Sequence, residues 1–107
     1  MEADVWNYRI VRRQLNDGAI YGMHEAYYSE SLALQGWTEA PYWTEQDQGD
    51  FALTIDRMEH EYKRDGTRPE WARFDDESDF LPTLKYMRQA CSKGIIDEDK
   101  EMGKWDD

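Results

Sequence analysis

The chain has 107 residues, with 24 acidic side chains against 13 lysines and arginines and a formal net charge of −11. This length fits a single domain over residues 1–107 with one modest core. Because nucleic acids and anionic lipids are themselves negative, the charge argues against direct contact with either. Five Trp, seven Tyr and three Phe favour a folded chain over a disordered one.

Cysteine usage and the N-terminal sequence bear on the compartment. Cys91 is the single cysteine, so it forms no internal disulfide, which favours a reducing environment. Residues 1–5 lack the basic and then apolar pattern of a signal peptide, and no apolar run approaches the length of a membrane span. The sequence therefore predicts a cytoplasmic protein.

Two runs rich in β-branched and aromatic residues flank Asp17-Gly18, a dipeptide that favours a type I′ turn. The runs predict a β-hairpin, and this turn places Tyr8 opposite Tyr27 in the register. One face of the hairpin then carries the more apolar set and is the candidate core side: Trp6, Tyr8, Ile10, Tyr21, Met23 and Tyr27. The opposite face is interrupted by Arg9, Arg13 and His24 and is expected to be solvated.

After the hairpin, residues 29–35 are expected to form a loop and residues 36–41 a short third strand. Pro41 ends that strand or marks a sheet edge, because proline has no backbone donor. Gly22, in the middle of the second strand, indicates a bulge or a closely approaching backbone.

Helical periodicity dominates the second half of the chain. Phe51, Ile55, Met58 and Tyr62 form one apolar stripe that predicts a helix over 51–63, which ends at Asp65-Gly66. Residues 67–77 are expected to be a loop or arm, tethered to the core by Trp71 and Phe74. A second helix is expected from an N-cap at Ser78 to Lys93-Gly94, with an apolar stripe of Phe80, Leu84, Met87 and Cys91.

These elements predict an α+β fold: a three-stranded antiparallel meander with one helix on its apolar face and a second helix appended towards the C-terminus. Residues 5–66 form the expected core unit. Residues 67–107 add the acidic arm, the second helix and a tail that is expected to be frayed from residue 97 onward.

Residue patterns that support catalysis or metal binding are weak. His24-Glu25 lacks the second histidine of a zinc helix, and Asp97, Asp99 and Glu101 lack the glycine and closing glutamate of a calcium loop. No catalytic, cofactor or metal site is predicted. An enzyme remains a third hypothesis, which rests only on His24, His60, Cys91 and scattered carboxylates.

Acidic clusters are the stronger signal, because residues 44–107 hold eighteen of the acids. Such a surface attracts basic partners, and carboxylates spaced like a phosphate backbone would attract a nucleic-acid-binding protein. The alternative is that the acids only keep the protein soluble. The predicted partner-binding residues are these acids, together with two tryptophans: Glu45, Asp47, Asp50, Asp75, Asp76, Glu77, Asp79, Asp97, Glu98, Asp99, Trp43 and Trp71.

Three segments carry a resemblance: Trp6-Asn-Tyr-Arg-Ile-Val-Arg, Tyr21-Gly-Met-His-Glu-Ala-Tyr-Tyr28 and Gly36-Trp-Thr-Glu. Over about residues 5–63 the chain resembles a group of short bacterial and phage proteins with the pattern WNYR(I/V)VR…YGxHExYY…G(W/Y)TE and a following acidic helix. Residues 29–35 depart from the Asp/Gly-rich turn of that group. The resemblance implies a hairpin-plus-helix core and a bacterial or phage origin.

The leading hypothesis is a non-enzymatic phage or prophage inhibitor that binds a basic, nucleic-acid-binding protein in the bacterial host cell. An anti-CRISPR role is its most specific form and rests on analogy with other small acidic phage proteins. The alternative is an interaction module anchored by aromatic side chains, including Trp43 and Trp71. A homodimer is a variant of that alternative, with the edge near Pro41 or the appended helix as the contact.

Overall fold

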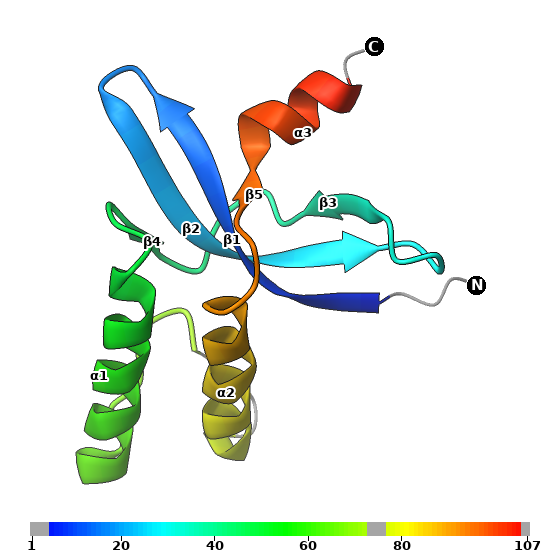
Figure 1. Ribbon diagram of the computed structural model, residues 1–107. Coiled ribbons are helices and arrows are strands. Elements are labelled where there is room, and N and C mark those ends of the chain that lie inside the picture. The colour runs from blue at the N-terminus through cyan, green and yellow to red at the C-terminus, as the bar shows by residue number, and fades with distance from the viewer. Residues whose placement is uncertain (1–4, 73–76, 106–107) are drawn as a thin grey trace.

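The computed structural model describes residues 5–72 and 77–105, and a long hairpin lies at its centre (Figure 1). The fold is mixed α+β: a curled sheet with helices packed against one of its faces. In chain order the elements are β1 (Val5–Leu15), β2 (Gly18–Tyr28), β3 (Leu34–Trp37), β4 (Thr44–Glu45), α1 (Asp50–Asp65), the 3₁₀ turn η1 (Glu77–Asp79), α2 (Phe80–Ala90), β5 (Ile96–Asp97) and α3 (Glu98–Trp105).

The predicted hairpin is present, but its predicted register is wrong by two residues. Leu15 pairs with Gly18 across a turn formed by Asn16 and Asp17, so that Tyr8 lies opposite Glu25 and not Tyr27. The positive φ of +139° falls on Gly18, after the turn. Glycine is therefore needed at the first residue of β2, and the type I′ turn does not form. A shift of two residues leaves every side chain on its predicted face.

The apolar face of the hairpin forms the main core. Tyr8, Ile10 and Met23 are buried there against both long helices. The stripe of α1 supplies Phe51, Ile55 and Met58, as predicted, and the stripe of α2 supplies Phe80, Leu84 and Met87. The two helices lie side by side and extend away from the same face of the sheet (Figure 1).

The helix ends agree with the sequence in part. Gly66, at a φ of +80°, closes α1 by donating its N–H to the Tyr62 carbonyl at 2.8 Å. At the start of α2, the residue in the N-cap position is Asp79 and not the predicted Ser78, and its side chain makes no capping hydrogen bond. The helix also ends at Ala90, before the predicted Lys93-Gly94.

The opposite face of the hairpin is not solvated as predicted. Val11, Ala26 and Ile96 form a second, smaller buried cluster, with Tyr28, Leu34 and Trp37 packed against it. Apolar side chains from β3 and β5 cover this face. The arginines there bind protein groups, as when Arg9 donates to the Gly94 carbonyl and to the Tyr28 hydroxyl.

The predicted three-stranded meander is present only as a part of a larger sheet. The strand order is β3-β2-β1-β5, and β4 also pairs with β2. Of the predicted third strand over 36–41, only residues 36 and 37 are in a strand, as the end of β3, and β4 follows after the predicted range. The predicted frayed tail instead forms β5, which runs parallel to β1, and the helix α3. Among the described residues, no helix combines the length and apolar character that crossing a bilayer requires.

Candidate interaction surfaces

The carboxylates at the start of α3 hold that helix against β1. Glu98 accepts two hydrogen bonds from the Arg13 guanidinium, at 2.9 and 3.1 Å, which raise the pKa of Arg13. Asp97 pairs with Arg12 at 3.4 Å and also accepts the backbone N–H groups of Asp99 and Lys100. Two of the predicted partner-binding acids are thus offset by arginines of the hairpin, and their role here is structural.

The carboxylates that precede α1 differ from one another. Glu45 accepts hydrogen bonds from the indole of Trp43, at 2.8 Å, and from the Thr54 hydroxyl, which ties β4 to the helix. Asp47 is exposed and accepts the Gly49 N–H at 2.9 Å. Asp50 is exposed in the first turn of α1, where a negative charge is favoured by the helix dipole.

The remaining predicted acids lie elsewhere. Asp75 and Asp76 fall outside the described residues, and Glu77 is described only in its backbone. Asp79 is exposed at the start of α2, while Asp99 is exposed on α3 beyond the opposite end of α2 (Figure 1). The described residues of the predicted acidic set therefore lie in three separate places: before or at the start of α1, just before α2, and around the start of α3.

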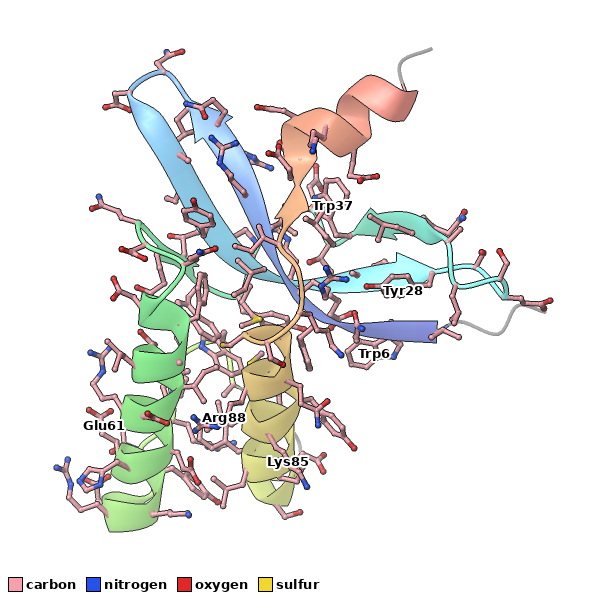
Figure 2. All side chains as sticks on the ribbon, viewed as in Figure 1. Trp6, Tyr28, Trp37, Glu61, Lys85 and Arg88 are labelled. Carbon is pink, nitrogen blue, oxygen red and sulfur yellow. The ribbon has the colours of Figure 1, made fainter. Side chains whose placement is uncertain are left out.

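Four of these acids stay available to a partner. Within residues 5–72 and 77–105, none of the four forms an ion pair with a lysine, an arginine or a histidine. By contrast, Asp56 and Glu59 of α1 bind Arg88 of α2, which lies between the two helices in Figure 2. The available carboxylates are Asp47, Asp50, Asp79 and Asp99.

The two predicted tryptophan anchors pack against the core. Trp43 and Trp71 stack with their ring centroids 5.6 Å apart and their planes at 16°. Trp43 also contacts Phe51, and Trp71 contacts Phe80, so both half-buried rings pack against the main core. The predicted tether at Trp71 is confirmed, whereas Phe74 lies outside the described residues.

A different pair of aromatic rings is exposed. Trp6 is 47% exposed and Tyr86 is 58% exposed, and both line a groove of about 350 Å³ between β1 and α2. Trp6 lies beneath β1 on the side where α2 extends from the sheet (Figure 2). Asn7, Tyr8, Gln89 and Lys93 complete the lining, which has no carboxylate. Sequence reasoning placed Trp6 on the core face, but helix α2 leaves it half uncovered.

Next to this groove, Glu25 accepts two tyrosine hydroxyls. Tyr27 donates to one carboxylate oxygen at 2.7 Å, and Tyr42 donates to the other. The bond to Glu25 raises the pKa of Tyr27 to about 12. Burial and the negative charge of Glu25 raise the pKa of Tyr8, which lies opposite Glu25 in the sheet. These tyrosines are held protonated, and the bond from Tyr42 to Glu25 ties the 38–43 segment to β2.

The groups that would support an enzyme are dispersed. His24 is 4% exposed, its Nδ1 bonds the Thr38 carbonyl at 2.9 Å, and burial lowers its pKa. Cys91 packs against the main core on the other face of the sheet, and burial raises the pKa of its thiol. His60 is exposed on α1. Within the described part of the chain, no three His, Cys, Asp or Glu side chains gather in a way that could hold a metal ion.

No protein-family profile, curated protein or solved structure matches this chain.

Proposed function

We propose that this protein is a non-enzymatic acidic binding protein whose partner is a basic, nucleic-acid-binding protein. In its most specific form it is a phage or prophage inhibitor that acts in the cytoplasm of a bacterial host, as an anti-CRISPR protein does. The proposal rests on one observation above all: in a chain of net charge −11, four exposed carboxylates form no ion pair among the described residues.

Charge supports a basic partner in two ways. The summed negative field attracts a positive surface from a distance and accelerates encounter. At contact, a carboxylate that is already paired within the fold has little to offer, so Asp97 and Glu98 contribute to the field and not to the contact. We therefore assign the contact to Asp47, Asp50, Asp79 and Asp99, together with Asp75, Asp76 and Glu77 of the acidic arm.

The structure favours long-range attraction over a single phosphate-like row of charges. Asp79 lies just before α2, Asp99 lies on α3 beyond the other end of α2, and Asp47 and Asp50 lie before or at the start of α1 (Figure 1). A partner that meets all of them must have a broad or concave basic surface. Grooves that hold nucleic acid have this character, because they neutralise many phosphates at once.

Affinity capture from bacterial lysate, at low and at high salt, tests the proposal. The bait is compared with the D47N/D50N/D79N/D99N variant, which keeps the size of each side chain. We expect basic nucleic-acid-binding proteins to be captured at low salt by the wild type, and to be lost at high salt or with the variant.

A matched control separates contact from net charge. The variant E2Q/D4N/D106N/D107N carries the same formal charge as the contact variant but changes only the two ends of the sequence. It should retain most of the capture. Equal capture by the wild type and the contact variant, unchanged at high salt, would refute the proposal.

The second candidate is an interaction module anchored by aromatic side chains, and the exposed rings of Trp6 and Tyr86 favour it. In this case alanine at Trp6 or Tyr86 abolishes capture, while the four asparagine substitutions hardly change it. Trp43 and Trp71 are weaker candidates, because both rings are partly buried and pack against the main core.

A further inference from the structure

The rest of the chain pairs with the two edges of the hairpin to different extents. The outer edge of β2 is paired along most of its length: β3 pairs with residues 26–28 and β4 with residues 21–22. Between them, Thr38 donates to the Glu25 carbonyl, and Met23 exchanges two backbone hydrogen bonds with residues 42–43. The outer edge of β1, by contrast, has only the two-residue strand β5, opposite Val11 and Arg12.

The hairpin register identifies which backbone groups of β1 are open. In a two-residue hairpin the residues that flank the turn bond each other, and bonded pairs then alternate along the ladder. Leu15 and Gly18 are the first bonded pair. The backbone N–H and C=O groups of the odd-numbered residues of β1 therefore bond β2, and those of the even-numbered residues point away from β2. β5 pairs only with Val11 and Arg12, and its pairing ends before Tyr8 and Trp6. Trp6 and Tyr8 are therefore left with outward N–H and C=O groups that have no backbone partner among the described residues.

Natural sheets protect such an edge with lysine, proline, a bulge or a covering segment. The edge from Val5 to Ile10 contains neither lysine nor proline, and the Arg9 side chain turns to the Gly94 carbonyl. Beside it lies the groove of Trp6 and Tyr86, whose lining has one cation and no acid. In a chain of net charge −11, the lining of this groove itself presents no negative charge to a second copy.

We propose that the outer edge of β1 pairs with the same edge of a second copy of this chain, which makes one continuous antiparallel sheet. Trp6 and Tyr8 have the open backbone groups, and one register pairs all of them: Trp6 of each copy lies opposite Tyr8 of the other copy. The two-fold axis then passes between the two Asn7 residues. Four backbone hydrogen bonds form, and each Trp6 ring lies near the groove of the other copy, as an isologous contact requires.

Cysteine cross-linking tests this register. At the two-fold axis the Asn7 residues form a non-bonded antiparallel pair, with Cα atoms about 4.5 Å apart, a distance that a disulfide spans. In the same register, Val5 of one copy lies four residues along the strand from Val5 of the other, so their Cα atoms are about 14 Å apart. In a C91S background, N7C should form a covalent dimer under mild oxidation with oxidised glutathione, and V5C should not.

Sedimentation of the purified full chain provides the second measurement. The wild type should be a dimer that strengthens as salt screens the repulsion between the two copies. W6K should weaken it about tenfold or more, because a lysine on an edge strand opposes pairing. L53K, at a residue that is 66% exposed on α1, is the matched control and should not change it.

Three outcomes would overturn this inference: a wild type that stays monomeric, a dimer in which N7C does not cross-link, and equal cross-linking of N7C and V5C. The effect of salt also distinguishes self-association from the proposed binding of a basic partner. Capture of a basic partner weakens as salt rises, whereas self-association strengthens, so that either proposal can fail while the other stands.

Discussion

Replacing Gly22 by alanine adds a methyl group where the neighbouring segment leaves no room for it. The new Cβ would lie 2.8 Å from the Pro41 Cβ and 2.9 Å from the His24 Nε2. An ordinary contact between such atoms is about 3.5–4.0 Å, so the proline ring or β2 must move by more than half an ångström. Neither neighbour moves easily, because Pro41 is a rigid ring and His24 is buried and bonded to Thr38.

Overpacking of this kind costs about 1–3 kcal/mol of unfolding free energy. For a domain of this size, that lowers the melting temperature by about 4–15 °C. Thermal and chemical denaturation, followed by circular dichroism, measure the effect. Gly36→Ala is the matched control: it is also in a strand, but no atom lies within 4 Å of its added Cβ. It should be neutral or stabilising by about 0.5–1 kcal/mol. If Gly22→Ala and Gly36→Ala behave alike, residues 38–43 are not held against β2 as described.

Three further predictions concern the core, the buried histidine and α3. Trp71→Ala should cost about 2–4 kcal/mol in chemical denaturation, whereas Trp6→Ala, at a half-exposed ring, should cost about 1 kcal/mol. Because burial lowers the pKa of His24, the unfolded chain takes up its proton at a higher pH. Stability should therefore be full above pH of about 6.5 and decrease below it, and His24→Gln should remove this dependence. Glu98→Gln should change global stability by less than about 1 kcal/mol, yet accelerate amide exchange in α3.

Much of the fold is predictable because periodicity is a local property of the sequence. The apolar stripes of both helices follow from spacing alone and are present, as is the core face of the hairpin at Tyr8, Ile10 and Met23. The opposite face, predicted to be solvated, instead forms the second buried cluster. The predicted register was wrong because Asn16-Asp17 and Asp17-Gly18 are both plausible turn dipeptides. Which of them forms the turn depends on which residue takes a positive φ. Strands of two residues, such as β4 and β5, are too short to leave a periodic signal.

The interaction surface is less predictable, because a carboxylate is available only if the fold leaves it unpaired. Glu98 is bound by Arg13, which is 85 positions away in the sequence, and no local sequence pattern predicts that contact. Trp43 and Trp71 lie outside any regular stripe, so their mutual stacking is also a tertiary feature. Trp6 belongs to the apolar face, but its exposure depends on how far α2 reaches beneath β1.

The dependence of partner affinity on salt tests the central claim most directly. For a basic partner recovered by capture, the logarithm of the dissociation constant is measured against the logarithm of the salt concentration, for the wild type and for D47N/D50N/D79N/D99N. Contact through unpaired carboxylates predicts a steep loss of affinity with salt for the wild type and a shallower slope for the variant. The same affinity at low and high salt, or the same slope for both proteins, would contradict it.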